Sequence, residues 1–238
     1  MFIENKLFVE IWGDRALFTR PELKAERYSY DVITPSAARN ILEAIYWHPG
    51  CNYIIDRIYL LSKHNNEGFF NCKENPIKMV SVKRNEVGEK GSANNVKRMM
   101  DGGPAASIDA SDKIQQRNSV LLKDVHYVIE AHIKISEEAH ESDNIAKYLD
   151  IFTRRCKKGQ CFHQPYLGCR EFICNFAWWD NPRNIPCVDL SCDFGLMLFD
   201  QEYPAEDSKG GRKAATPVFY RAKMDRGVIQ VEGAEVYR

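Results

Sequence analysis

The chain lacks a net charge, because its 238 residues include 33 Lys and Arg against 33 Asp and Glu. A protein that binds nucleic acid over its whole surface is usually basic, so any such binding here must be local. The sequence also lacks an apolar run approaching the roughly 18 residues of a membrane span. Residues 1–15 show no basic segment followed by an apolar stretch and a small-residue cleavage site. We therefore expect a cytoplasmic protein with no membrane partner.

The eight cysteines lack the C-x2-C spacing of common zinc sites. Three pairs share a C-x4-C spacing instead: Cys156 with Cys161, Cys169 with Cys174, and Cys187 with Cys192. A metal site that includes His163 is conceivable, but free thiols in a reducing compartment are the favoured interpretation. We expect no metal and no cofactor.

Large apolar side chains are scarce between residues 85 and 118, where Gly, Ser, Asn, Asp and Lys dominate. Such a composition predicts a flexible insertion. Its Lys97, Arg98 and Arg117 could reach a phosphate backbone, although a solvated loop tip is the favoured interpretation.

What the sequence does contain is a concentration of basic, glycine and aromatic residues at 157–172, KKGQCFHQPYLGCREF. Basic side chains neutralise phosphates, glycines admit a ligand to the backbone, and aromatic rings such as that of Phe162 stack on unpaired bases. This combination favours RNA binding, and the alternative is an ordinary surface loop with a solvated charge run. The candidate RNA-binding residues are Lys157, Lys158, Gly159, His163, Tyr166, Gly168 and Arg170.

Hydrophobic periodicity predicts the elements around these segments. Thr34 followed by Pro35 is typical of a helix start, and Pro49–Gly50 ends that helix, with Tyr46 in its last turn. Strands are expected at 5–12 (ended by Gly13), 53–61, 78–83, 120–135 and 228–231, and a second helix at 141–155. The order favours an α+β fold with a ferredoxin-like antiparallel sheet and two helices over residues 1–174. Residues 175–238 are expected to form a small β-rich C-terminal region.

Four blocks of the sequence resemble a known family. They are WGDRALFTRPELKAERYSYDVITPSAARNILEAIYWHP at 12–49, RNEV at 84–87, LLKDVHYVIEAH at 121–132, and TRRCKKGQCFHQPYLGCREF at 153–172. Together they are similar to the CRISPR-associated RAMP superfamily, and specifically to the "Cas five" subunit of the type I-C (Dvulg) Cascade. The blocks occur in the same order over about the first three quarters of the chain.

The resemblance implies a metal-independent endoribonuclease that cuts CRISPR repeat RNA at the base of its stem-loop. It then keeps the 5′ handle of the crRNA within Cascade, beside the backbone and large subunits. It also implies an RRM-type fold with a glycine-containing loop after the second helix. In other type I subtypes a related subunit binds the handle without cutting.

The resemblance also implies three catalytic positions. A tyrosine at the end of the first helix matches Tyr46, and a lysine near the start of the second matches Lys147. The histidine that follows this lysine in the family is replaced here by Tyr148. The departure matters, because an imidazole suits proton transfer near neutral pH and an ordinary phenol does not.

The chemistry can also be considered without the family. Cutting RNA without a metal requires an aligned 2′-OH, a cation for the phosphoryl oxygens and an acid for the leaving oxygen. Lys147 fits the role of the cation, and Tyr46 could position or deprotonate the 2′-OH. His48 and His163 are the available imidazoles, but we interpret His48 as a helix-end residue and His163 as a contact to RNA or to a backbone carbonyl.

Tyr148 in the histidine position keeps a second hypothesis open: a non-catalytic subunit that binds the crRNA 5′ handle. A generic RRM-type RNA-binding module is disfavoured, because the sequence lacks an RNP-like aromatic strand motif.

Overall fold

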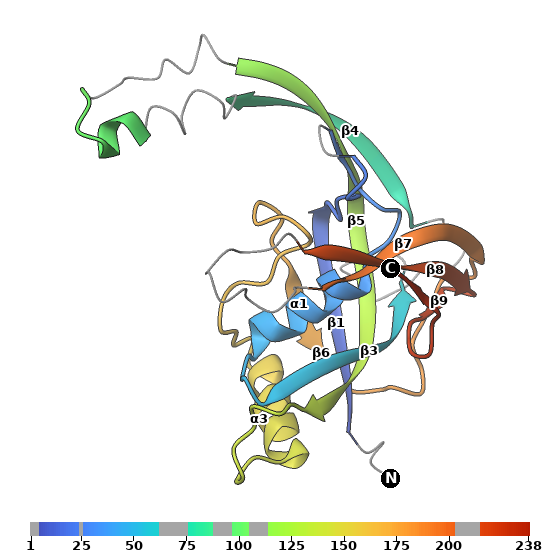
Figure 1. The fold of residues 1–238 in the computed structure, drawn as a ribbon. Helices are drawn as coiled ribbons and strands as arrows, with labels where there is room; N and C mark the ends of the chain where they lie inside the picture. Colours follow the sequence, from blue (N-terminus) through green and yellow to red (C-terminus); the bar gives the residue numbers. More distant parts are fainter. Residues whose placement is uncertain (1–4, 24–25, 62–75, 88–96, 105–113, 203–214) are drawn as a thin grey trace.

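The computed structural model describes residues 5–23, 26–61, 76–87, 97–104, 114–202 and 215–238 (Figure 1). In chain order the strands and helices are β1 (Lys6–Ala16), β2 (Arg27–Tyr28), α1 (Pro35–Ile45), β3 (Cys51–Leu60), β4 (Lys78–Val87), β5 (Ile114–Ile135), α3 (Ile145–Lys157), β6 (Asn175–Trp178), β7 (Cys192–Glu202), β8 (Thr216–Asp225), β9 (Val228–Gln230) and β10 (Val236–Tyr237). No helix among these residues is long and apolar enough to cross a membrane.

The strands form one sheet with the order β10-β8-β9-β3-β5-β1-β6. Strands β2 and β4 pair with β5 outside this path, and β7 pairs with β8. Every pairing is antiparallel except that of β2 with β5. The predicted α+β class is therefore confirmed as a mostly antiparallel sheet with few helices.

Helix α1 begins where the sequence predicts. The side chain of Thr34 accepts a hydrogen bond from the backbone N–H of Ala37 at 3.2 Å, and Pro35 occupies the first turn. The helix ends at Ile45, and Tyr46 is its C-cap, with extended backbone. Tyr46 therefore stands at the point where the chain turns from α1 toward β3.

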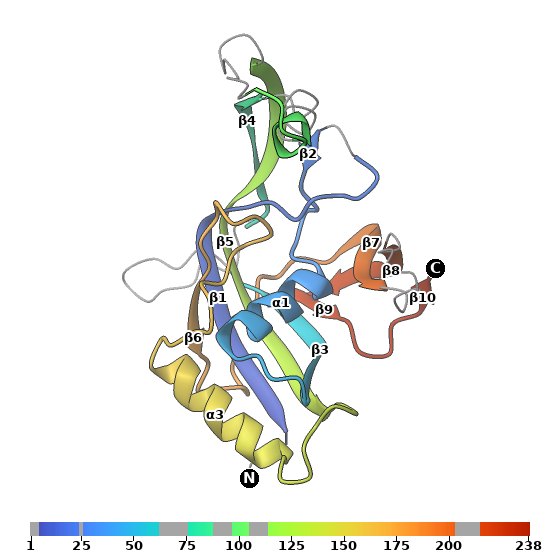
Figure 2. The same ribbon diagram turned by 60° about the vertical axis from the view of Figure 1, so that its left-hand side comes forward.

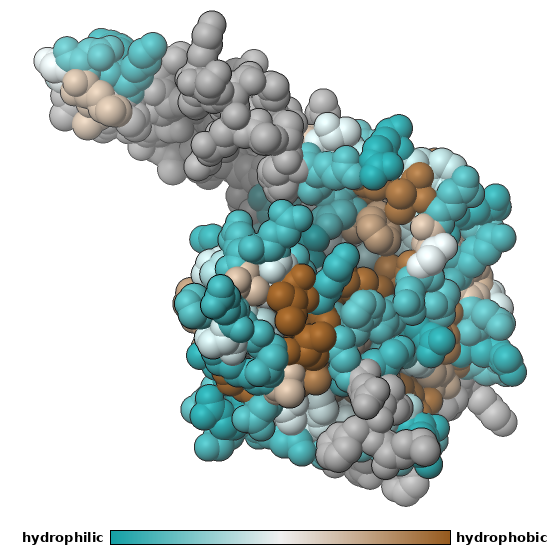
Figure 3. All heavy atoms as spheres, turned by 60° about the horizontal axis from the view of Figure 1, so that its bottom comes forward, coloured by the Kyte–Doolittle hydropathy of each residue, from teal (hydrophilic) through white to brown (hydrophobic). Residues whose placement is uncertain are grey.

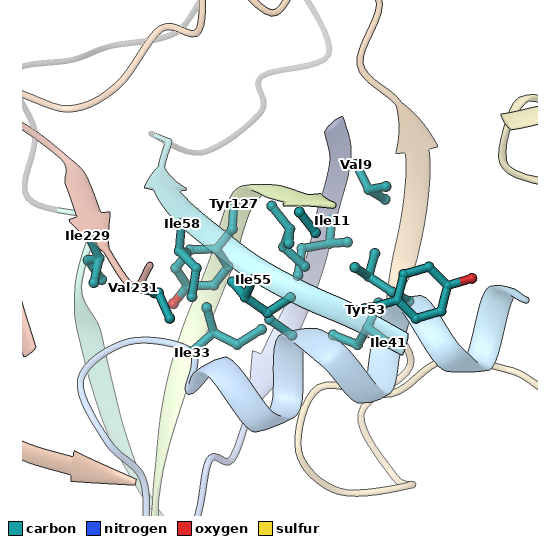
Figure 4. Packing of buried hydrophobic residues seen from close by; sticks show 14 of the residues in the cluster. Val9, Ile11, Ile33, Ile41, Tyr53, Ile55, Ile58, Tyr127, Ile229 and Val231 are labelled. Carbon is teal, nitrogen blue, oxygen red and sulfur yellow. The ribbon is translucent and has the colours of Figure 1, made fainter. Parts of the chain in front are cut away.

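The hydrophobic core lies between the helices and the sheet. Figure 4 shows Ile33, which precedes α1, and Ile41, within α1, packed against side chains of the central strands. Helix α3 buries Tyr148, Phe152 and Cys156, which recur every four residues and so share one face. Figure 2 shows α1 and α3 on the same side of the sheet.

Strand β1 is longer than predicted, because Gly13 does not end it. Gly13 pairs with Val125, and β1 continues to Ala16. A Cβ atom on Gly13 would lie 2.5 Å from Leu167 Cδ1 and 2.9 Å from the carbonyl oxygen of Ile173. The glycine is thus needed inside the strand, because the segment after α3 crosses it closely.

Strands β4 and β5 also extend beyond their predicted bounds. They pair as far as Val87 opposite Ile114, so both ends of the predicted 85–118 insertion belong to the ladder. In Figure 1 this hairpin projects away from the rest of the sheet. Residues 88–96 and 105–113 of the insertion lie outside the described residues, and its flexibility stays a prediction.

The C-terminal strands continue the main sheet. Strand β9, at Val228–Gln230, lies where a closing strand is predicted and pairs with β3. Strands β7, β8 and β10 follow on the same side in Figures 1 and 2. The division of the chain at residue 174 stays a prediction. On the face seen in Figure 3 the described surface is mostly hydrophilic, with hydrophobic residues gathered in local patches.

A buried carboxylate links three strands of the sheet. Glu130 on β5 is 2% exposed and contacts the ammonium of Lys6, the hydroxyl of Tyr59 and the guanidinium of Arg57. Burial alone would raise the pKa of Glu130, but the hydrogen bonds from Lys6 and Tyr59 outweigh it, and the pKa is lowered. The carboxylate therefore contributes more to stability when it is ionised.

We predict that Glu130→Gln lowers the free energy of unfolding at pH 7 by about 1–3 kcal/mol, measured by urea unfolding, because it removes a buried charge that its partners require. A carboxylate with a lowered folded-state pKa stabilises above its unfolded-state pKa, and that contribution is lost as the pH falls through the folded-state value. The difference between wild type and variant should therefore shrink below about pH 4. Asp193→Asn, which breaks an exposed pair with Arg221, is the control and should change stability much less, because solvent screens an exposed ion pair. An equal loss in both variants would contradict the prediction.

Candidate functional site

The site forms where the segment after α3 docks on the end of α1. The backbone N–H of Phe162 donates to the carbonyl of Ala44 at 2.8 Å, and that of His163 donates to the same oxygen at 3.1 Å. Arg155 of α3 donates to the carbonyl of Ile45 at 3.3 Å. The last carbonyls of a helix have no partner within the helix, so these contacts satisfy them and fix α1, α3 and the loop relative to one another.

Tyr46 is held at the centre of this junction and is 7% exposed. Its N–H donates to Leu42 at 3.0 Å, and its carbonyl accepts a hydrogen bond from the buried hydroxyl of Tyr53 at 2.7 Å. The guanidinium of Arg155 lies 5.1 Å from the centre of its ring. Burial raises the pKa of Tyr46 although Arg155 opposes this, so its phenol stays neutral near pH 7.

Lys147 lies in the first turn of α3, and its side chain is 47% exposed. Its ammonium is 2.8 Å from the carboxylate of Asp143. Hydrogen bonds from Lys147 and then Tyr148 lower the pKa of Asp143, and the same ion pair raises the pKa of Lys147. The pair is therefore ionised at neutral pH, and it places one exposed cation beside Tyr46.

Tyr148 is fully buried and packs against Tyr46 and against His48 in the turn after α1. Its ring centre lies 6.3 Å from that of Tyr46 and 5.2 Å from that of His48. Its hydroxyl is 3.1 Å from His48 Nδ1, and burial raises its pKa. The structure thus brings Tyr46, Lys147 and Tyr148 together from segments about 100 residues apart, and adds His48, for which the sequence predicts only a helix-end role.

The predicted RNA-binding residues follow on from this cluster along the segment after α3. Phe162 is 64% exposed and Trp47 is 54% exposed, and their ring centres are 6.4 Å apart. His163 and Arg170 are exposed, Lys158 caps α3, and Lys157 forms an ion pair with Asp180 at 3.2 Å. Sequence reasoning missed Trp47, because an aromatic residue at a helix end is usually a packing residue.

The two glycines of this segment have different surroundings. Both have positive φ angles, +63° at Gly159 and +83° at Gly168, which favour glycine. No atom lies within 4 Å of a Cβ built on Gly159, so its backbone is open to a ligand. A Cβ on Gly168 would overlap the carbonyl oxygen of Leu17, so this glycine lets the segment dock on the sheet.

Two cavities line the outer side of α1. The larger, about 460 Å³, lies between α1 and β7, and the smaller, about 260 Å³, ends at Trp47 and His163. They share Asn40, Glu43 and Tyr166 and so form one trough. The sequence does not predict that Asn40 and Glu43 line a cavity. The polar face of an amphipathic helix is usually in contact with solvent, and only the structure shows that distant segments cover it here.

The described cysteines are free thiols: Cys51, Cys156, Cys161, Cys169, Cys174, Cys187 and Cys192. Within the part of the chain that the structure describes, no group of three or more His, Cys, Asp or Glu residues is placed to hold a metal ion. Burial raises the pKa of the Cys51 thiol to about 11 and that of Cys156 to about 12, so both stay protonated.

Comparison with known proteins identifies one family along nearly the whole chain. The Cas_Cas5d model of the family described as CRISPR-associated protein (Cas_Cas5) matches residues 7–232. The chain is 43% identical over 234 residues to the CRISPR pre-crRNA endoribonuclease Cas5d of Mannheimia succiniciproducens, covering 95% of each chain. It is 38% identical over 244 residues to the protein of the same name from Thermus thermophilus, covering 98% of this chain and 93% of that one.

Two solved structures share the fold. A functionally uncharacterized protein from Streptococcus mutans, SMU1763c, aligns with a TM-score of 0.63 and 20% identity, covering 98% of this chain and 97% of the other. A structure described as a CRISPR-associated protein aligns with a TM-score of 0.61 and 21% identity, covering 100% and 99%. Fold and sequence together place the chain among the CRISPR-associated proteins. Within them, it belongs to the Cas5 family, as the four sequence blocks predict.

We predict that Gly168→Ala is more destabilising than Gly159→Ala, measured by thermal and urea unfolding. Both variants incur a left-handed backbone cost of about 1–2 kcal/mol. Only Gly168→Ala adds an overlap with the Leu17 carbonyl, which should cost a further 1–3 kcal/mol or so. Equal losses would mean that the segment does not dock on β1 in this way.

Proposed function

We propose that this chain is a metal-independent endoribonuclease that cuts CRISPR repeat RNA and then stays bound to the 5′ handle of the crRNA. The observation that carries the proposal is the agreement between the relatives' activity and the geometry of the site. Two relatives aligned over nearly the whole chain are named pre-crRNA endoribonucleases. In this chain the phenol of Tyr46 and the ammonium of Lys147 lie in one cluster beside an exposed basic and aromatic loop.

The proposed reaction is attack of a 2′-OH on the adjacent phosphate, which leaves a cyclic phosphate and a 5′-hydroxyl. Lys147 places a protonated ammonium where negative charge grows on the phosphoryl oxygens. Tyr46 positions the 2′-OH by hydrogen bonding, because its raised pKa makes it a poor base at neutral pH. Tyr148 has no exposed surface and therefore supports the cluster from beneath.

RNA binding is proposed for the loop that joins this cluster. Phe162 offers an exposed ring for an unpaired base, while Lys157, Lys158 and Arg170 offer charge to phosphates. His163, Tyr166 and the open backbone at Gly159 complete the predicted set, with Gly168 holding the loop in place.

The finer fold assignment is also a proposal. The strand order β3-β5-β1-β6, with α1 after β1 and α3 after β5, supports a ferredoxin-like RRM-type domain. We further propose that the chain acts in the cytoplasm as a Cascade subunit beside the backbone and large subunits.

One observation favours a second function, a non-catalytic subunit that binds the crRNA 5′ handle. The position at which the resemblance implies a histidine holds the buried phenol of Tyr148, which does not titrate near neutral pH. Tight binding of repeat RNA without cutting would establish this alternative.

We predict that purified protein cuts a labelled repeat hairpin in EDTA and leaves a 5′-hydroxyl on the downstream product. A single 2′-deoxy substitution at the cut site should abolish cutting, because it removes the nucleophile, while binding persists. A denaturing gel and end-labelling with polynucleotide kinase measure both results. A requirement for Mg²⁺, or cutting of the 2′-deoxy RNA, would exclude this mechanism.

We predict that Lys147 contributes to the cleavage step, whereas Lys157 and Lys158 contribute to RNA binding. Lys147→Ala should lower the single-turnover rate constant at least about 100-fold, because it removes a cation from the developing charge, and leave affinity nearly unchanged. Lys157→Ala with Lys158→Ala should weaken binding and reduce the slope of log affinity against log salt by about 0.7 for each phosphate that is no longer neutralised. The opposite pattern, or an unchanged slope, would show that the roles are assigned wrongly.

A further inference from the structure

The trough beside α1 contains a carboxylate that lacks hydrogen-bond donors. Glu43 lines both of its cavities, and its side chain is 35% exposed. The Arg39 Nε atom lies 3.4 Å from this carboxylate but forms no hydrogen bond, because both terminal nitrogens of Arg39 are directed at Asp200. Burial raises the pKa of Glu43, and Arg39 opposes this only in part. Within the described part of the chain, the Glu43 carboxylate is therefore an acceptor without a donor.

The end of the trough near the loop after α3 has an aromatic mouth. This smaller cavity is lined by Asn40, Glu43, Ala44, Trp47, His163 and Tyr166. The backbone of His163 is bonded to Ala44, so the loop forms a wall that is fixed relative to α1. The indole of Trp47 is 54% exposed and can therefore stack on a ligand.

The larger end of the trough has the size of a small-molecule site. In Figure 2 α1 faces the viewer, with β7 to its right, and the bonds from Arg39 to Asp200 join the two elements. The cavity of about 460 Å³ between them falls within the roughly 300–1,000 Å³ typical of ligand sites.

The charges of the trough disfavour a phosphate as its ligand. Its charged lining residues are Arg39, Glu43 and Asp200, and the one cation among them is already bonded to Asp200. A ligand must instead bring N–H donors to Glu43. The exposed amide of Asn40, which lies in the same cavities, offers both a donor and an acceptor. An unpaired nucleobase meets these demands, because it has a flat face for stacking and an edge of donors and acceptors.

We propose that the trough binds one unpaired base of the RNA, stacked on Trp47, and that Glu43 selects a base with an exocyclic amino group. Adenine, cytosine and guanine carry such a group. Uracil instead presents its edge N–H between two carbonyl oxygens, which a carboxylate repels. The inference rests on the proposed function and adds Asn40, Glu43 and Trp47 to the residues that contact RNA. Trp47 directly follows Tyr46, so the base lies close to the proposed cut site.

The first measurement removes single amino groups from the RNA. The probe is the repeat hairpin with a 2′-deoxy nucleotide at the cut site, so that binding is measured without cutting. At each unpaired position in turn, adenosine is replaced by purine riboside, guanosine by inosine, and cytidine by pyrimidin-2-one riboside, each of which lacks only the amino group. We expect wild type to lose about ten-fold in affinity at one of these positions, a usual effect of losing one base-edge contact.

Glu43→Ala tests whether the carboxylate reads that amino group. Removing an acidic side chain near RNA should strengthen binding if the side chain acts only through its charge. We expect the opposite, a loss of about ten-fold for the unmodified RNA. The variant should also cease to respond to the amino deletion at the identified position, because both changes remove the same contact. Glu232→Ala, which removes an exposed acidic side chain outside the trough, should keep the wild-type response.

Trp47→Leu separates stacking from reading of the base edge. This variant should bind the unmodified RNA about ten-fold less tightly, because it removes the stacking surface. It should keep the response to the amino deletion, since a ring face does not read the base edge. When the nucleotide at the identified position is replaced by an abasic one, Trp47→Leu should cause no further loss.

The outcomes keep the inference and the endoribonuclease proposal distinguishable. If wild type binds and cuts but responds at no unpaired position, or if Glu43→Ala keeps the wild-type response, the inference is overturned and the endoribonuclease proposal stands. If wild type binds without cutting, the endoribonuclease proposal fails, and the binding measurements still decide the inference. A wild type that does not bind the repeat RNA overturns both. Thermal unfolding checks each variant. Should Glu43→Ala fail to fold, Glu43→Gln, which keeps the shape but one acceptor oxygen fewer, replaces it, and a full wild-type response in that variant overturns the inference.

Discussion

The site depends on the last carbonyl groups of α1, which have no hydrogen-bond partner within the helix itself. A helix that ends inside a protein must find donors for its last carbonyls. Here the backbone of the loop at Phe162 and His163, and the guanidinium of Arg155, supply them. One set of hydrogen bonds therefore satisfies the end of α1 and anchors the loop that follows α3. It also places Tyr46 against α3.

The same junction determines the electrostatics of the cluster. Burial keeps Tyr46 and Tyr148 neutral, since removing a phenolate from water is costly, whereas Lys147 and Asp143 remain charged because they form an ion pair. The cluster thus has one exposed cation and several neutral donors. That set suits the stabilisation of negative charge on a phosphate better than it suits repeated proton exchange.

Local patterns predict the parts of this structure that local physics controls. The Thr34 cap, the proline that follows it and the apolar stripe of α1 all lie within a dozen residues, and each appears as predicted. The prediction that Gly13 ends β1 is wrong, because the reason for a glycine there is the Leu167 segment, which crosses β1 from over 150 residues away. The contact between His48 and Tyr148 is hidden from the sequence for the same reason, since the two residues are 100 positions apart.

The zero net charge of the chain gives the basic loop a particular character. Arg155, in the last turn of α3, stacks on Tyr46 and bonds to α1, and Lys157 pairs with Asp180, so two cations in or next to this loop have partners within the protein. The exposed Lys157 pair is weak and can exchange for a phosphate, whereas Arg155 is committed to the junction. If the loop binds RNA as proposed, fewer cations are then available to the RNA than the sequence contains. We therefore expect much of the affinity to come from stacking and from the shape of the site, contributions that depend little on salt.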